Sequence, residues 1–443
     1  MTNVWLYKKA CGVARMVPLV ATILFVGCAK PTNVFMDTPA LYSTAGVTID
    51  QVTVESKRTP AIEILYATDR TFDPDDPKGP YTAERDRYLR LGVARVRVGE
   101  EGATWAEIAE ASSELDRKKD LFMYLDEVED FGPIADSVWS ADPLASDPNV
   151  NVPGERFSSL VNERLSASRR KEIVVYVAQF KVDFDVAAFT TSEFFHYVGR
   201  NGVFIAYSWP TKTGVLDYFS ATENAYLTVG NLRLFLDYLA RETDAEQIHL
   251  VTYSAGARVL SGALQELRLK YSYMDEAQVK DHLRIGNVVY TAPDIDAAAW
   301  GMQYRDGAAE VAQTITIYTT KRDRALGTSQ WLFGWDRLGS IDIKDFTPHA
   351  VEYLQEHDSV AFIAVADAEN ANQDNGHGYF RRSPWVSTDI LLNLALDLPP
   401  DERCLYRDPG DPVWHFPDDY RESVSKLVDR LSVERAPSAS VSP

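Results

Sequence analysis

The stretch from Gln247 to Leu260, QIHLVTYSAGARVL, carries residue types suited to nucleophilic chemistry. Apolar residues up to Val251 predict a buried strand, and the apolar pattern after Gly256 predicts a helix. Between them, Thr252-Tyr253-Ser254-Ala255-Gly256 is a variant of Gly-x-Ser-x-Gly with Thr at the first position. A strained turn of this kind lifts a serine hydroxyl above a sheet, and it needs small residues two before and two after the serine. The pattern therefore predicts Ser254 as a nucleophile.

A serine nucleophile needs a base to take its proton and a buried carboxylate to orient that base. His377 lies in Asn375-Gly376-His377-Gly378-Tyr379, a loop with small flanking residues that follows the last predicted core strand. Asp323 follows the predicted strand Thr314 to Thr320. Ligands of open α/β sheets bind beyond the carboxyl ends of the strands, which is where all three residues fall. We predict a triad of Ser254, Asp323 and His377.

Other residues compete for the roles of acid and base. Asp294 and Asp296 also follow a strand, but Asp323 lies one strand later, and we expect Asp294 to shape a pocket wall or cap a helix. The remaining histidines fit the base less well, because His249 lies inside a strand, His196 and His282 lie in helical patterns, and His349, His357 and His415 lie in irregular stretches. A histidine on a surface loop is common on its own, so the prediction of His377 depends on Ser254 and Asp323.

Strands and helices alternate from Glu172 onward. Apolar runs predict strands at Glu172 to Ala178, Gly202 to Trp209, Gln247 to Val251, Ile285 to Ala292, Thr314 to Thr320 and Val360 to Ala366. Helical patterns lie between them, at Phe184 to Arg200, Asn224 to Arg241 and Thr388 to Asp397 among others. Upstream, Ala61 to Thr68 and Leu91 to Val98 predict strands, Trp105 to Asp120 and Phe157 to Arg170 predict helices, and Asp130 to Gly154 predicts a long excursion. This alternation predicts an α/β fold with a mostly parallel central sheet covered by helices on both faces.

Composition excludes several classes of function. The net charge of −20 argues against a nucleic-acid partner, since phosphate binding needs clustered Lys and Arg. No group of Cys and His has zinc-ligand spacing, so we predict no metal. No Gly-x-Gly-x-x-Gly follows an early strand, which weakens a nucleotide-binding interpretation, and we predict no cofactor.

The N-terminus has the pattern of a secretory signal. Lys8, Lys9 and Arg15 precede an apolar run from Met16 to Val26, and Phe25-Val26-Gly27-Cys28 resembles a bacterial lipobox. We predict that residues 1–28 are a lipoprotein-type signal, that Cys28 is lipidated, and that the protein is held by this anchor in the cell envelope, facing the periplasm. An ordinary signal peptide or a short uncleaved anchor is the alternative. We further predict a tether over 29–60, one domain over 61–433 with an insertion near 100–170, and a disordered tail over 434–443.

The ordered set of motifs resembles a little-characterised bacterial branch of the α/β-hydrolases, once described as a domain of unknown function. The motifs are YATDR at Tyr66 to Arg70, SWP at Ser208 to Pro210, the elbow with Arg258, APDID at Ala292 to Asp296, RDRAL at Arg322 to Leu326 and GHGYF at Gly376 to Phe380. The resemblance covers roughly Ile62 to Asn393. It implies an α/β-hydrolase fold, an esterase-like or lipase-like activity, and the same Ser254, Asp323 and His377.

One loop departs from the family pattern. Members usually carry His-Gly-Tyr-Asn after the third core strand, where the oxyanion loop begins, and this chain has Ala178-Gln179-Phe180-Lys181. The resemblance implies an oxyanion hole built from the backbone N–H of Ala255 and one of Gln179 or Phe180. A glycine tolerates a strained loop more readily than Gln179 does.

Two functions therefore stay open. The first is a serine hydrolase acting on a carboxylic ester or related acyl bond of a small-molecule or lipid-like substrate. The second is a catalytically weakened α/β-hydrolase-fold lipoprotein with a binding or scaffold role, which the altered oxyanion loop favours. An aromatic cluster of Trp331, Leu332, Phe333 and Trp335 would suit an acyl pocket, but we interpret it as core or helix packing.

Overall fold

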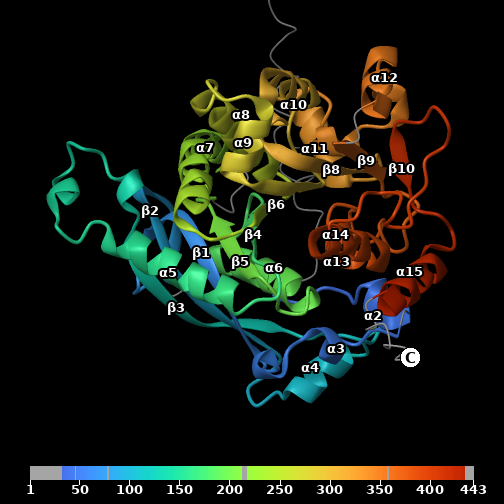
Figure 1. Ribbon diagram of the computed structural model, residues 1–443, viewed down its shortest axis with the longest axis horizontal. Coiled ribbons are helices and arrows are strands. Elements are labelled where there is room, and N and C mark those ends of the chain that lie inside the picture. The colour runs from blue at the N-terminus through green and yellow to red at the C-terminus, as the bar shows by residue number, and fades with distance from the viewer. Residues whose placement is uncertain (1–31, 45, 77–78, 212–216, 357–358, 435–443) are drawn as a thin grey trace, which may run out of the picture.

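The protein's structure, a computed structural model, describes residues 32–434 except 45, 77–78, 212–216 and 357–358 (Figure 1). These residues form a ten-stranded sheet in the order β10-β9-β8-β7-β6-β4-β5-β1-β2-β3. The strands β1, β2 and β3 pair antiparallel, and all other neighbours pair parallel. The mostly parallel sheet predicted from the alternation of elements is confirmed. The strands are β1 Ala61–Phe72, β2 Tyr81–Val98, β3 Met123–Pro133, β4 Glu172–Val177, β5 Val203–Ser208, β6 Gln247–Tyr253, β7 Ile285–Thr291, β8 Ala312–Thr319, β9 Val360–Ala364 and β10 Val413–His415.

The direction of the chain through the sheet reverses around β4. From β4 the chain moves outward to β5, and it then returns past β4 to β6 and continues in the other direction through β7, β8 and β9. A reversal of this kind opens a crevice beyond the carboxyl ends of the two strands that flank it. The loops that follow β4 and β6 are therefore neighbours at this edge of the sheet, and the predicted nucleophile lies in the second of them.

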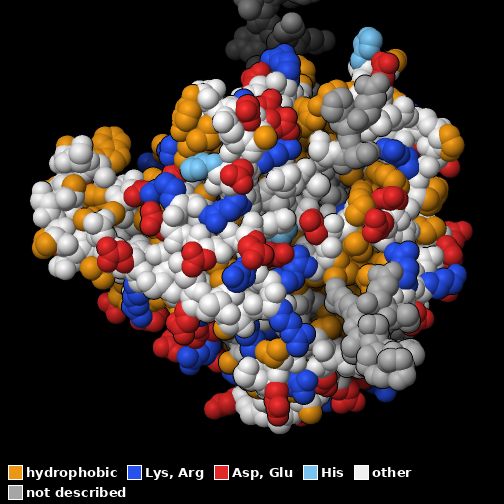
Figure 2. Space-filling model, viewed as in Figure 1, with side chains coloured by type: hydrophobic (Ala, Val, Ile, Leu, Met, Phe, Trp, Pro, Cys, Tyr) orange, Lys and Arg blue, Asp and Glu red, His pale blue; other side chains and the backbone are white. Residues whose placement is uncertain are grey.

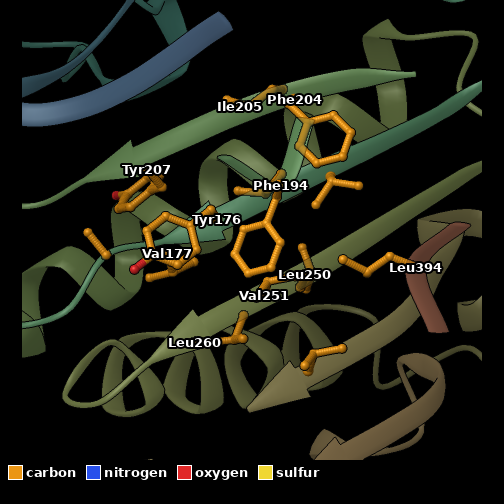
Figure 3. Close-up of a cluster of buried hydrophobic side chains, with 14 of the residues drawn as sticks. Tyr176, Val177, Phe194, Phe204, Ile205, Tyr207, Leu250, Val251, Leu260 and Leu394 are labelled. Atoms are coloured by element: carbon orange, nitrogen blue, oxygen red, sulfur yellow. The ribbon is translucent and has the colours of Figure 1, made fainter. Parts of the chain in front are cut away.

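Helices cover both faces of the sheet, as predicted. The helices α7 and α8 pack on one face, and α6 and α14 pack on the other (Figure 1). Figure 3 shows the layers between them, with Phe194 of α6 and Leu260 of α8 on opposite sides of β4 and β6. The helices are α2 Ala40–Thr44, α3 Ile49–Val52, α4 Trp105–Ala111, α5 Val152–Ser166, α6 Phe184–Tyr197, α7 Asp217–Glu242, α8 Gly256–Lys270, α9 Glu276–Leu283, α10 Ala297–Gln303, α11 Arg324–Phe333, α12 Pro348–Glu356, α13 Tyr379–Arg382, α14 Pro384–Leu396 and α15 Tyr420–Glu434.

The central strands are buried on both faces. Every residue of β5 and of β7 is buried, and so is every residue of β4 after Glu172. This follows from their continuous apolar sequences, since a strand covered by helices on both sides needs no polar alternation. The core therefore holds the carboxyl ends of these strands rigidly in register.

The antiparallel edge differs from the prediction. The strand expected at 91–98 begins ten residues earlier, β3 occupies part of the expected excursion over 130–154, and the helix expected over 105–120 ends at Ala111. Arginines of β2 face acidic residues of β3, as in the pairs Arg90–Asp130 and Arg97–Asp126. Opposite charges across neighbouring strands stabilise a sheet without the apolar alternation that marks a strand in a sequence.

The segment predicted as a tether is packed against the domain in its described part. Phe35 and Met36 are buried, and α2 packs against α14 and α15. The fully buried Glu193 accepts the Met36 N–H at 2.7 Å and pairs with Arg381 at 2.6 Å. Arg381 also donates to the carbonyl of Val34. The tether prediction is wrong for this segment because two residues far away in the sequence bind it.

The predicted signal sequence, its lipidation site Cys28 and the predicted tail from residue 435 onward lie outside the described residues. Among the helices that the structure does describe, none has both the length and the apolar character needed to cross a bilayer. Acidic and basic side chains are interspersed on the face of the molecule that Figure 2 shows. After β9, the core strand predicted last, the chain continues through α13 and α14 to the short β10 and then to α15.

Candidate active site

Ser254 occupies the turn between β6 and α8 in a left-handed backbone conformation, with φ of 53°. Its N–H donates to the carbonyl of Thr291 at 3.0 Å, and its carbonyl accepts the N–H of Asp294 at 3.0 Å. A left-handed conformation is unfavourable for a residue with a Cβ, and it persists where the surrounding structure enforces it. The end of β7 thus holds Ser254 in the strained turn that the sequence predicted.

Gly256 is required by close packing at this turn. A Cβ at this position would lie 2.5 Å from Thr252 Oγ1 and 2.6 Å from the carbonyl oxygen of Ala178. Thr252, which replaces the usual first glycine, is fully buried, and its hydroxyl donates to the Val177 carbonyl at 3.3 Å. The threonine is tolerated because its hydroxyl finds an acceptor at the end of β4, and it leaves no room for a side chain on Gly256.

His377 bridges Ser254 and Asp323. Its Nε2 lies 2.9 Å from Ser254 Oγ, and its Nδ1 lies 2.6 Å from Asp323 Oδ2. The loop that presents it is fixed by its neighbours. Asn375 accepts the His377 N–H with its side chain at 3.0 Å and the Arg324 N–H with its carbonyl at 2.9 Å. The histidine loop is therefore attached directly to the start of α11, the helix that follows Asp323.

Asp323 is buried, and both of its carboxylate oxygens are used. Its Oδ1 accepts the Leu326 N–H at 2.9 Å and so caps α11, while Oδ2 faces His377. An N-cap carboxylate is held at a defined angle by the helix that it starts. The cap leaves the second oxygen as the one that orients the imidazole.

The pKa of His377 is raised above its ordinary value. Burial lowers this pKa, but the charge and hydrogen bond of Asp323 outweigh burial, and the charge of Asp294 adds to them. These carboxylates stabilise the imidazolium form. The same interaction would stabilise the cation that forms when an imidazole takes a proton from a serine.

The rival carboxylates are bound elsewhere. Asp294 is nearly buried between two guanidinium groups, at 2.9 Å from Arg258 Nη2 and 3.4 Å from Arg337 Nε, and it accepts the hydroxyl of Ser329 at 2.7 Å. Burial raises the pKa of Asp294, but the two arginines outweigh burial and lower it. Asp296 caps α10 by accepting the Ala299 N–H. The two ring nitrogens of His377 contact Asp323 and Ser254 instead.

The residues predicted to supply an oxyanion hole lie around the elbow. Ala255 follows Ser254, and the Ala178 carbonyl lies against the first residue of α8, so the loop after β4 adjoins the elbow. Within the part of the chain that the structure describes, the backbone N–H groups of Ala255 and Gln179 donate no hydrogen bond. The left-handed conformation in this loop falls on Lys181, with φ of 68°, and not on Gln179. The side chain of Gln179 accepts the hydroxyl of Tyr176 at 2.9 Å.

The structure also places the competing histidine of β6 and the aromatic cluster around α11. His249 is buried in β6 and accepts the Asn287 N–H, as expected for a sheet residue. The aromatic cluster is not core, because Trp331 and Trp335 are 66% and 67% exposed on and beyond α11. Phe333 alone packs inward, beside Arg258 and Arg337. Among the described residues, no group of three His, Cys, Asp or Glu side chains has the arrangement of a metal site.

Three residues of the sequence motifs, for which the sequence predicted no role, contact the loops that form the site. Tyr379 of GHGYF accepts the Ala292 N–H and donates to the Tyr318 carbonyl, so it ties the histidine loop to β7 and β8. Trp209 of SWP donates its indole N–H to the Ala178 carbonyl at 2.6 Å. Arg70 of YATDR is fully buried beside the loop after β4. Their signal was membership of a motif, because nothing in local composition distinguishes them.

The sheet order, the helices on both faces and the serine turn at the reversal define an α/β-hydrolase fold. The model of the family described as alpha/beta hydrolase of unknown function (DUF900) matches residues 155–393, more than half of the chain. The protein belongs to this family, which supports a hydrolase activity and confirms the resemblance seen in the sequence. No curated protein matches the chain. Ser254, Asp323 and His377 all lie inside the matched region, whereas Arg70 lies before it.

Proposed function

We propose that the protein is a serine hydrolase that cleaves a carboxylic ester or related acyl bond with Ser254, His377 and Asp323. The observation that carries this proposal is the chain of two contacts, 2.9 Å from Ser254 Oγ to His377 Nε2 and 2.6 Å from His377 Nδ1 to Asp323 Oδ2. A nucleophile, a base and an orienting carboxylate in this arrangement activate a serine at neutral pH.

In the proposed mechanism, Ser254 Oγ attacks the acyl carbonyl carbon while His377 Nε2 takes the hydroxyl proton. The carbonyl oxygen becomes an oxyanion, which accepts the Ala255 N–H and one N–H from Gln179 or Phe180. The intermediate collapses, the bond to the leaving group breaks, and His377 returns the proton to that group. A water molecule then attacks the acyl-serine with His377 again as base, and this releases the acid and restores Ser254.

The unused N–H groups support catalysis over a purely scaffolding role. An unpaired backbone N–H in a buried position is unfavourable, so such groups are rare unless a ligand uses them. Ala255 is buried and its N–H donates to no described residue. Gln179 needs no left-handed conformation, so the missing glycine does not by itself distort this loop.

The test is activity-based labelling of the purified protein with a fluorophosphonate, together with hydrolysis of short-chain aryl esters. We expect the wild type to be labelled at Ser254 and to hydrolyse the esters. Ser254→Ala should fold normally and lose both activities, because alanine fits the turn and removes only the hydroxyl. Absence of labelling in the wild type would instead favour the binding or scaffold role.

We also propose that the protein is a lipoprotein anchored through Cys28 in the bacterial cell envelope and facing the periplasm. The charged N-terminal region, the apolar run and the lipobox-like sequence support this. Mass spectrometry of the protein from its native host should find an acylated Cys28 as the first residue. An intact Met1 or an unmodified Cys28 would refute the anchor without touching the proposed chemistry.

A further inference from the structure

Arg70 is a fully buried guanidinium at the carboxyl end of β1. Its Nε donates to Ser208 Oγ at 3.0 Å, and its Nη1 donates to the Thr82 carbonyl at 3.2 Å. Its Nη2 donates to the Val182 carbonyl at 2.7 Å and to Thr211 Oγ1 at 3.3 Å. One side chain thus links the end of β1 to the loops that follow β4 and β5.

These contacts are unusual for a buried charge. Removing a guanidinium from water is costly, and proteins usually offset this cost with a carboxylate in direct contact. Among the described residues, no carboxylate lies within ion-pair distance of Arg70. Burial lowers the pKa of Arg70 to about 10, and the more distant charges of Asp183, Asp69 and Asp185 only partly oppose this. Arg70 Nε and Nη1 donate to the strands β5 and β2, and Nη2 donates to the loops after β4 and β5, so the side chain fixes those two loops to the sheet.

The loop after β4 is held at both ends by this network. At its start, the Ala178 carbonyl accepts the indole N–H of Trp209 at 2.6 Å. At its end, Val182 is bound by Arg70 and by the Thr211 hydroxyl, which donates to the Val182 carbonyl at 2.8 Å and accepts its N–H at 3.3 Å. The residues between these two fixed points are Gln179, Phe180 and the left-handed Lys181.

We propose that Arg70 is the positioning residue of the oxyanion loop, and that it holds the backbone of residues 179–181 through its contacts with Val182 and Thr211. The inference rests on the proposed serine-hydrolase function. Arg70 touches neither Ser254 nor His377 in the contacts described above, so it acts through the backbone of residues 179–181. A misplaced oxyanion donor reduces the stabilisation of the transition state more than it reduces the affinity for substrate.

Arg200 provides a matched control at the opposite end of the same strand. It is also a buried arginine, and its Nη1 donates to the carbonyls of Lys57 at 2.8 Å, Thr59 at 2.8 Å and Ala61 at 3.1 Å. Burial lowers the pKa of Arg200 to about 9. Arg70 lies nine positions after Ala61 in β1, which is roughly 30 Å along the strand, so Arg200 shares the chemistry of Arg70 but not its contact with the loop after β4.

The experiment compares Arg70→Lys and Arg200→Lys in the full chain. Hydrogen exchange measured by mass spectrometry reports on peptides containing residues 178–182, and steady-state kinetics with an aryl ester reports kcat and KM separately. We expect both variants to lose thermal stability. Only Arg70→Lys should show faster hydrogen exchange in the peptide that contains the loop. Its kcat should fall by about ten- to hundredfold with little change in KM, because losing one oxyanion donor completely lowers the rate by roughly a hundredfold or more. The acid limb of its pH–rate profile should stay in place, because His377 is untouched.

Two outcomes would overturn the inference. One is an Arg70→Lys variant with normal loop exchange and normal kcat. The other is an equal loss of kcat in both variants, which would indicate a general effect of lower stability. If Arg70→Lys does not fold, Thr211→Val removes one hydroxyl at nearly constant volume and should show the same pattern more weakly; unchanged exchange and kcat in that variant would count against the inference.

Failure of the proposed function has a different signature. In that case wild-type Ser254 resists the fluorophosphonate and no variant has a measurable kcat, so the catalytic part of the inference fails with it. The exchange measurement needs no activity and still decides whether Arg70 holds residues 178–182.

Discussion

Asp294 and Asp323 follow neighbouring strands, both are buried, and yet they have different partners. Asp323 uses one oxygen to cap α11 and turns the other to His377. Asp294 lies between Arg258 and Arg337 and accepts a hydroxyl from Ser329. The two carboxylates therefore have similar positions at the edge of the sheet, but only Asp294 is paired with guanidinium groups.

This difference shows what makes a buried carboxylate available to a histidine. A carboxylate paired with guanidinium groups is already compensated, and little of its charge remains to favour an imidazolium. A carboxylate held by a neutral backbone N–H keeps its full charge for the next partner. Asp323, which contacts His377 directly at 2.6 Å, accordingly raises the pKa of His377 more than Asp294 does.

Of the changes to these two aspartates, Asp323→Asn should have the largest effect on activity. The amide oxygen can still accept the Leu326 N–H, so we expect the fold to survive. The amide NH₂ would then face His377 Nδ1, which must act as an acceptor, and the proton moves to Nε2, where it blocks the base. Activity should fall by about ten-thousandfold in kcat, measured by steady-state ester hydrolysis. A loss of less than about tenfold would show that another group orients His377.

Asp294→Asn should have the reverse profile. The change removes the charge that compensates Arg258 and Arg337, and breaking a buried ion pair costs about 3 kcal/mol in the free energy of unfolding. Because the change leaves the contacts of His377 intact, kcat should fall by less than about tenfold. Denaturant unfolding and ester hydrolysis of the same preparation measure both quantities. A stable variant with very low activity would assign Asp294 a direct part in catalysis.

The smallest effect concerns pH. A protonated His377 cannot accept the serine proton, so kcat/KM should rise with pH through a pKa above the ordinary value for histidine. Asp294→Asn removes a negative charge that favours the imidazolium, so the acid limb should move to lower pH. The residual activity of Asp323→Asn should show a larger movement in the same direction. Movement of either limb to higher pH would contradict the assigned electrostatics, and pH–rate profiles of the three proteins decide it.

The triad could be predicted from the sequence because its signals are local or ordered along the chain. Ser254 lies in a strand–turn–helix pattern, and the order of the strands favours Asp323 over Asp294. The sequence could not predict which groups bind each aspartate, because Arg258 and Arg337 contact Asp294 from elements that are separate in the sequence. Local patterns specify elements well, while the pairing of charges depends on the assembled fold.

The failures of prediction have the same origin. The excursion predicted over 130–154 begins inside β3, whose acidic residues face the arginines of β2. The segment from residue 32 reads as a tether because Glu193 and Arg381, which bind it, lie more than 150 residues away. Trp331 and Trp335 read as core because hydrophobicity alone does not say which side of a helix is covered. Each error concerns a long-range contact.

The packing of residues 34–36 on Glu193 and Arg381 has a mechanical consequence. The folded domain includes residues as early as Val34, so only a few residues separate it from Cys28. Because an extended chain advances at most about 3.6 Å per residue, the four residues from Cys28 to Thr32 reach at most about 14 Å. If Cys28 carries the proposed lipid, this short connection would keep the folded domain close to the bilayer surface. The domain could then change its orientation relative to the bilayer but could move only a short distance away from it.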